Sequence, residues 1–119
     1  MAAEEVPGEV LAGISTELVQ LHHRAFGRGP TRAQSFSRED TVICLLGGAL
    51  TTPERTLVAE GNVDAVHRLR SDLRAAIEAP AKAIVERATG RRVIAYISQI
   101  RPDADLAVEV FVLEPSSAS

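Results

Sequence analysis

The chain has 119 residues, which suits one domain around one hydrophobic core. Its net charge is −3, so no overall basic field attracts a nucleic acid. Aromatic residues make up only 3%, which argues against a platform that stacks nucleotide bases. We therefore expect a globular protein with no nucleic-acid partner.

Cysteine usage and the N-terminus indicate a location. Cys44 is the only cysteine, so the chain forms no internal disulfide, as is usual in a reducing compartment. The opening stretch, MAAEEVPGEV, is acidic and lacks the apolar core of a secretory signal. No apolar stretch approaches the roughly 20 residues that a spanning helix needs. We expect a cytoplasmic protein without direct membrane insertion, peripheral to a membrane only through partners.

Residues 9–26 have the spacing of an amphipathic helix. Apolar residues recur three or four positions apart: Val10, Leu11, Ile14, Leu18, Leu21, Ala25 and Phe26. Gly27 or Gly29 can adopt the left-handed conformation that ends a helix, and Pro30 blocks its continuation. We therefore interpret the segment from Gly27 to Pro30 as a structural turn.

Four later segments are predicted to be strands: residues 31–38, 41–49, 91–100 and 106–114. The segment TVICLLGGAL is β-branched and strongly apolar. Turn-forming residues separate them in pairs, Glu39-Asp40 in the first pair and Pro102-Asp103 in the second. Each pair is expected to form an antiparallel hairpin.

The middle of the chain predicts two helices, bounded by residues that favour helix ends: Thr51 to Gly61, and Asn62 or Val63 to Gly90. Thr51 can cap the first helix, and Glu54 can reach back to complete a capping box. Pro80 lacks a backbone N–H, so we expect it to kink or break the second helix near Ala79.

These elements predict an α+β protein in the order α-β-β-α-α-β-β, with a four-stranded antiparallel sheet and helices packed on it. Residues 8–114 form its single domain. Residues 1–7 are expected to fray at the N-terminus, and residues 115–119, PSSAS, to form a flexible tail.

The predicted strands carry apolar residues on both faces. Runs such as TVICLLGGAL and AVEVFVLE leave neither face polar throughout. Helices of this length can cover one side of such a sheet, and a large exposed apolar face is rare on a monomer. A two-fold related copy would cover the other side, so we expect a homodimer.

Few residues suggest chemistry. His22 and His23 point about 100° apart on a helix and cannot bind one metal together, so we expect no metal or cofactor, with His22 at the buried edge and His23 exposed. Cys44 lies in an apolar strand and should be a small buried hydrophobe. One acidic cluster lacks the spacing of a calcium loop and predicts a solvated surface: Asp103, Asp105, Glu109 and Glu114.

Arginines around the glycine turn are candidates for binding. The turn follows a helix, whereas phosphate cradles use helix N-termini, so a nucleotide site is not expected. Arg28 and Arg32 can still bind a small anion or an acidic partner surface, and Arg70 is a further candidate contact. No residue is assigned a catalytic role.

Five segments, in this order, resemble the MpsC-like family: ISTELVQLHHRAFGRGPT, GALTTPERTLVAEG, VHRLRSDLR, ATGRRVIAYIS and DADLAVEVFVLE. The resemblance covers roughly residues 14–114. The matching positions are Gly27, Gly29, Pro30, Thr31, Leu50, Thr51, Glu54, Leu57, Arg70, Thr89, Gly90, Val93, Glu109, Phe111 and Leu113.

The resemblance implies a role beside a membrane system. The family is named for a sodium-translocating, membrane-potential-generating system of bacteria, and some members are associated with membrane subunits of ion and inorganic-carbon transport. By this resemblance the chain would be a non-enzymatic accessory or regulatory subunit of a membrane ion or bicarbonate transport system. Two alternatives stay open, namely a small-anion or metabolite-binding sensor using Arg28, Arg32 and Arg70, and an enzyme using Cys44 or His22.

Overall fold

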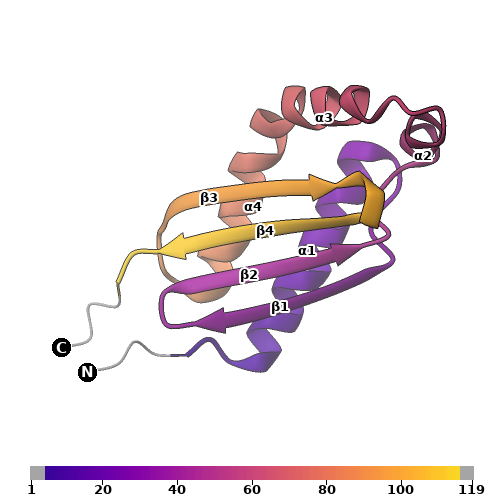
Figure 1. Cartoon of the computed structure of the whole chain (residues 1–119). Coiled ribbons are helices and arrows are strands. Elements are labelled where there is room, and N and C mark those ends of the chain that lie inside the picture. Colours follow the sequence, from indigo (N-terminus) through magenta and orange to yellow (C-terminus); the bar gives the residue numbers. More distant parts are fainter. Residues whose placement is uncertain (1–4, 116–119) are drawn as a thin grey trace.

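The computed structural model describes residues 5–115 and has the predicted α+β architecture (Figure 1). Its elements are α1 (Gly8–Phe26), β1 (Arg32–Arg38), β2 (Thr41–Gly47), α2 (Thr52–Ala59), α3 (Val63–Asp72), α4 (Arg74–Thr89), β3 (Val93–Arg101), the short 3₁₀ helix η1 (Pro102–Ala104) and β4 (Leu106–Leu113). The four predicted strands are confirmed, with small differences at their ends. Of the termini expected to fray, residues 1–4 and 116–119 lie outside the described part, while Val6 packs against the core.

The strands form one antiparallel sheet in the order β1-β2-β4-β3. Both predicted hairpins are present, and pairing of β2 with β4 joins them in a register that sets Cys44 opposite Glu109. The first hairpin turns at Glu39, with φ of 52°, and the second turns through η1 into Asp105, with φ of 50°. The last strand of the chain is therefore central, and β1 and β3 are the edges.

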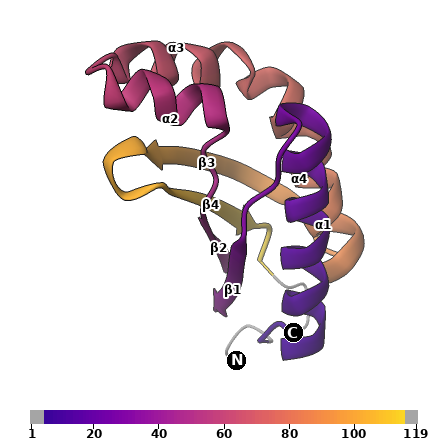
Figure 2. The same cartoon turned by 90° about the vertical axis from the view of Figure 1, so that its right-hand side faces the viewer.

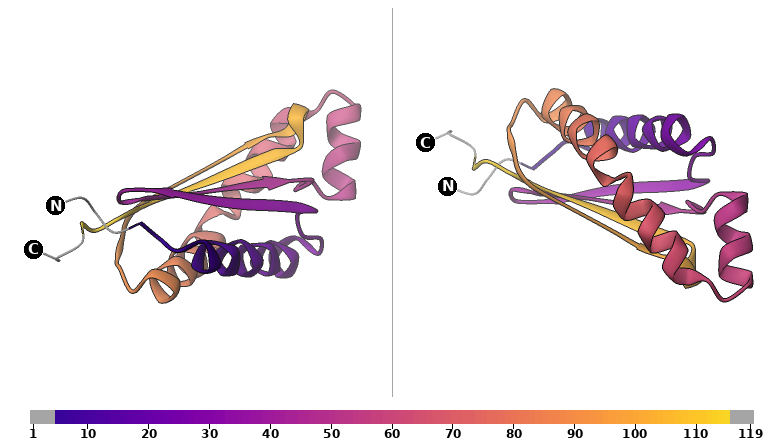
Figure 3. Two further views of the ribbon diagram at one scale, coloured as in Figure 1. Left: turned by 90° about the horizontal axis from the view of Figure 1, so that it is seen from below. Right: turned by 90° about the horizontal axis from the view of Figure 1, so that it is seen from above.

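Helices α1 and α4 pack against each other and cover one face of the sheet (Figures 2 and 3). Every second residue of β2 and β4 is buried beneath them: Val42, Cys44, Leu46, Ala107, Glu109, Phe111 and Leu113. The helices contribute Ile14, Leu18, Ile84 and Val85 to this core. At one end of the sheet, α2 lies near η1, and α3 connects it to α4 (Figure 1).

The opposite face of the sheet is apolar across its middle and polar at several positions of the edge strands, and no helix within residues 5–115 covers it (Figure 3). Strand pairing aligns four side chains in one row across this open face: Phe36, Ile43, Val110 and Ile97. Phe36 is 41% exposed and Ile97 is 58% exposed. The apolar character of both sheet faces, predicted from the strands, is thus present in the folded chain.

The long helix predicted in the middle of the chain is two helices, α3 and α4, that meet at Leu73. Leu73 has φ −91° and ψ −3°, and it ends one helix and starts the next. Of the kink or break predicted near Ala79, the break is wrong, because α4 continues through Pro80, and the kink stays a prediction. A proline removes one helical hydrogen bond, whereas the bend at Leu73 lets both Val66 of α3 and Ile77 of α4 be buried.

The two glycines after α1 serve different purposes. Gly27 caps the helix at φ 77°, and its N–H donates to the carbonyl oxygen of His23, so the predicted left-handed cap is confirmed. Gly29 lies outside the left-handed region, but a Cβ there would lie only 3.1 Å from the carbonyl oxygen of Val19. Gly29 therefore permits the chain to pass close to α1 before Pro30, which is buried.

Replacing Gly27 with Ala should destabilise the fold by about 1 kcal/mol. No atom lies within 4 Å of a Cβ added there, so the cost comes from the left-handed backbone alone. Gly13→Ala is the matched control, because Gly13 has equally open space inside α1, and Ala should stabilise the helix there by about 0.5–1 kcal/mol. Urea unfolding measures both variants, and equal effects at the two sites would contradict the capping role.

Candidate functional site

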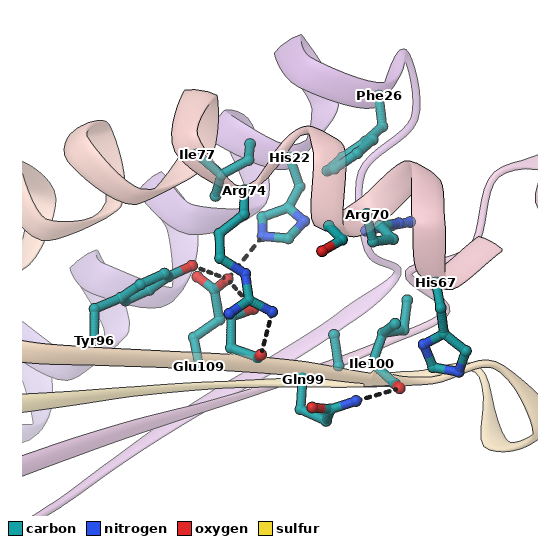
Figure 4. Close-up of a pocket in the computed structure, with 13 residues that line it drawn as sticks. His22, Phe26, His67, Arg70, Arg74, Ile77, Tyr96, Gln99, Ile100 and Glu109 are labelled. Carbon is teal, nitrogen blue, oxygen red and sulfur yellow. Dashed lines mark hydrogen bonds and ion pairs between the residues drawn. The ribbon is translucent and has the colours of Figure 1, made fainter. Parts of the chain in front are cut away.

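A pocket of about 200 Å³ lies where α1, α3 and α4 meet strands β3 and β4 (Figure 4). Its lining combines the buried polar side chains of His22 and Glu109 with the exposed side chain of Arg74. Ile77 and Ile100 add apolar surface. Polar and charged side chains make up most of the lining, so the pocket suits a polar ligand with a small apolar part.

Glu109 is the carboxylate of this pocket, and only 1% of the residue is exposed. Its Oε2 accepts hydrogen bonds from the hydroxyls of Tyr96, at 2.6 Å, and Ser98, at 3.2 Å. The Nε2 atom of His22 lies 3.6 Å from the same oxygen. Oε1 is buried and has no hydrogen-bond partner among residues 5–115, which is costly for a carboxylate oxygen.

The two-residue period of β4 places Glu109 on the helix-covered face. Ala107 and Phe111, two positions to either side, are buried on the same face. Burial by itself favours the neutral acid, but His22 and the hydroxyl of Tyr96 counteract it and hold the pKa of Glu109 below its usual value. The carboxylate is therefore charged at neutral pH despite its burial.

Tyr96 and Ser98 reach Glu109 from the neighbouring edge strand. The β3–β4 register sets Ser98 opposite Glu109, and Tyr96 lies two residues away on the same face. Burial and the nearby carboxylate raise the pKa of Tyr96, so its hydroxyl stays protonated and donates. Because each hydroxyl uses its O–H to donate a hydrogen bond to Glu109, the lone pairs of the two hydroxyl oxygens remain available to accept.

Helix α1 directs His22 into the pocket. His22 is 4% exposed and His23 is exposed, as the helical spacing predicts. The imidazole packs beside Phe26, with ring centroids 5.6 Å apart. Neither ring nitrogen has a hydrogen-bond partner in the described part of the chain. His22 therefore meets Glu109 through the 3.6 Å contact between Nε2 and Oε2, without a hydrogen bond to the described part of the chain.

A buried ion pair borders the pocket. Arg70 of α3 donates two hydrogen bonds of 2.7 Å to Glu54 and one of 2.9 Å to the carbonyl oxygen of Ala49. Glu54 also completes the capping box with Thr51 that the sequence predicts for α2. The guanidinium of Arg70 stacks 4.0 Å from the ring centroid of Phe26. The pair therefore joins α1, α2 and α3 at one side of the pocket.

Arg74 is the uncompensated cation of the pocket. Its side chain extends from the start of α4 toward the strands, beside Glu109 (Figure 4). Its Nη2 donates to the carbonyl oxygen of Ser98 at 3.4 Å. No carboxylate of residues 5–115 forms an ion pair with it. Since the side chain is exposed, it can contact a ligand without first breaking an ion pair within this part of the chain.

The three arginines predicted as binding residues are not brought together. Arg28 is exposed in the turn after α1, and Arg32 is exposed on the open face, where its guanidinium lies against Gly47. Arg70 does line the pocket, but its Nε and Nη2 donate to Glu54 and to the carbonyl oxygen of Ala49. The cation available to a ligand is Arg74, which the sequence did not single out as a binding residue.

The predicted solvated acidic surface was wrong for two of its members. Glu109 is buried, and the carboxylate of Asp105 accepts a hydrogen bond of 2.8 Å from the N–H of Leu50. The alternation in AVEVFVLE could have revealed Glu109, because it shares the period of buried apolar residues. Tyr96 and Ser98 had no comparable signal, since the register between strands is not visible in a sequence.

A family profile described as Na+-translocating membrane potential-generating system (MpsC) matches residues 7–115. This chain belongs to the MpsC family. The match spans nearly the whole chain and confirms the resemblance carried by the five segments. Neither the curated proteins nor the solved structures include a match to this family member. Across residues 5–115, none of its helices combines the length and apolarity that a membrane crossing requires.

In this MpsC-family chain, Glu54→Gln should destabilise the fold by about 3–5 kcal/mol. The substitution leaves Arg70 without its counter-charge, and the two side chains are only 11% and 0% exposed. Asp103→Asn is the control, because the Arg101–Asp103 pair is exposed and should contribute little. Urea unfolding at neutral pH measures both variants, and similar small losses would show that the buried pair is not needed.

The same unfolding measurement in acid should reveal the charge of Glu54. Burial favours its neutral form, but Arg70 and Thr51 outweigh this and hold the pKa of Glu54 below 4.5. A folded-state pKa below the unfolded one gives stability that is complete above the unfolded value and is lost as pH falls through the folded value. The wild type should therefore lose more stability than Glu54→Gln between about pH 6 and pH 3.

Proposed function

We propose that this protein is a non-enzymatic accessory or regulatory subunit of a bacterial membrane system that transports ions or bicarbonate and generates a membrane potential. The observation that carries the proposal is the family match over residues 7–115, which includes every helix and strand. The protein acts on the cytoplasmic side and reaches the membrane through its partners. The single, buried cysteine supports a reducing compartment.

The side chains available for covalent chemistry support an accessory role over an enzymatic one. Cys44 is fully buried, as the sequence predicts, and burial raises the pKa of its thiol. A neutral buried thiol is a poor nucleophile. His22 has no hydroxyl or thiol within hydrogen-bond distance among residues 5–115, so it has no nucleophile to activate.

The open face of the sheet supports a homodimer. Its central row of Phe36, Ile43, Val110 and Ile97 is apolar, and the same strands continue it with Leu45, Val108 and Val112. A second copy can bury this surface face to face, as in sheet-on-sheet packing. A stable dimer needs roughly 1,200 Å² of total buried area, which one face of a four-stranded sheet on each subunit is large enough to supply.

The turn after α1 supports contact with a membrane partner. Helix α1 lies on the covered side of the sheet, so a dimer through the open face leaves its C-terminal end accessible (Figure 3). Arg24 and Arg28 are exposed there. Guanidinium groups suit carboxylates on an acidic partner surface. Each subunit of the dimer would then offer one such turn to the membrane subunits.

Light scattering at micromolar concentration should give a mass near twice 12.7 kDa. Ile97→Glu should return the protein to a monomer, because it places a charge in the apolar row of the open face, on edge strand β3, where the wild-type side chain is 58% exposed. Leu69→Glu is the matched control, since Leu69 is 42% exposed on α3, away from the sheet, and should leave the dimer intact. A wild-type mass of 12.7 kDa across a tenfold concentration range would exclude the dimer.

Loss of the gene should lower the sodium-dependent membrane potential of inverted membrane vesicles from the native bacterium. The wild-type gene should restore the potential, and Arg28→Glu should restore less because it reverses a charge at the proposed partner contact. Arg87→Glu, on the outer surface of α4, is the control and should restore it fully. An unchanged potential in the deletion strain would refute the accessory role.

A further inference from the structure

Beside Glu109 the pocket presents a buried carboxylate oxygen without a partner among residues 5–115, and the imidazole of His22 lies 3.6 Å from the other oxygen of the same carboxylate. Glu109 Oε1 has no partner, and the hydroxyl oxygens of Tyr96 and Ser98 have already directed their protons to Oε2. A ligand group that enters here must therefore donate hydrogen bonds. A primary ammonium carries three N–H donors and a positive charge, and it suits three acceptors beside a carboxylate.

Arg74, whose side chain extends beside Glu109, has the opposite requirement (Figure 4). Arg74 is exposed, has no carboxylate partner within residues 5–115, and bonds only loosely to the carbonyl oxygen of Ser98. A guanidinium in this position favours a carboxylate. Arg70 does not compete for it, because Glu54 holds its Nε and Nη2.

The size and walls of the pocket limit the rest of the ligand. Its volume of about 200 Å³ is somewhat larger than a cavity of about 150 Å³ that accommodates benzene. A molecule of about six to nine non-hydrogen atoms fits this space. Ile77, Ile100 and Ala107 provide apolar contact for a short aliphatic side chain.

We propose that this pocket binds a small aliphatic α-amino acid, with its ammonium group at Glu109 and its carboxylate at Arg74. The inference is separate from the accessory role, because neither the family description nor the open face names a ligand for this side of the sheet. The zwitterion has no net charge, and each of its two charged groups meets one of these two oppositely charged residues.

Simpler ions fit the pocket less well. An inorganic anion at Arg74 leaves Glu109 Oε1 unsatisfied and lies near its negative charge. A metal ion would need several acidic, histidine or cysteine ligands, and no group of three exists among residues 5–115. One anionic and one cationic residue side by side favour a ligand that carries both charges close together.

The test is a titration of the isotope-labelled full chain, followed by amide NMR shifts. The probe is L-valine up to about 10 mM, and its matched controls are isobutylamine, which lacks the carboxylate, and isovalerate, which lacks the ammonium. We expect saturable shifts at Tyr96, Ser98 and Glu109 with L-valine. Each control should bind at least roughly tenfold more weakly, because it loses one charge-assisted contact.

Two variants assign the ends of the ligand. Arg74→Gln should weaken L-valine at least roughly tenfold and leave isobutylamine unchanged, because only the carboxylate contact is lost. Because Arg74 is exposed, its replacement should leave the fold intact, and Arg87→Gln on the same helix is the matched control. Glu109→Gln should weaken both L-valine and isobutylamine, once its amide spectrum shows the native fold.

Three outcomes would overturn the proposal. The first is the absence of saturable shifts with L-valine, L-alanine and L-leucine. The second is equal binding of isovalerate and L-valine, which would indicate a site for simple carboxylates. The third is a set of shifts confined to the shallow groove between α1 and β1, around Ser15 and Ser35, which would place the ligand elsewhere.

Discussion

Two helices can cover only one face of this four-stranded sheet, and that limit gives the two faces different environments. Under α1 and α4, Phe111 and Cys44 are fully buried, whereas Phe36 and Ile97 on the other face are largely exposed. Because strand side chains alternate, each residue of β2 and β4 belongs to one environment or the other. A polar residue on the covered side must therefore find partners inside the protein, and an apolar residue on the open side needs cover from outside.

Glu109 is a polar residue on the covered face whose hydrogen bonds within the protein are incomplete. Tyr96 and Ser98 satisfy one of its oxygens, and His22 faces it from α1, but the second oxygen has no partner in the described chain. An apolar side chain at this position would pack between the helices and the sheet without such a deficit. Polar groups that depart from the surrounding apolar pattern are expected where function overrides stability.

The Arg70–Glu54 pair shows how the same fold satisfies a buried charge completely. Glu54 receives bonds from Arg70 and from the N–H of Thr51, and Arg70 stacks on Phe26. This pair holds α2 and α3 at the end of the sheet and keeps the side of the pocket in place. The contrast between the satisfied Glu54 and the unsatisfied Glu109 makes the latter the better candidate for a ligand contact.

The sequence by itself determined the features that depend on neighbours in the chain. Local backbone preferences predict the cap at Gly27, the capping box of Thr51 and Glu54, and both hairpins. The two-residue period predicts strands with apolar residues on both faces. The two-residue period of β4 also places Glu109 among the buried positions, although the acidic residues near it in the sequence suggested a solvated surface. Only the tertiary structure decided the bend at Leu73, the partners of Glu109 and the position of Arg74, because these depend on strand register and helix packing between residues far apart in the sequence.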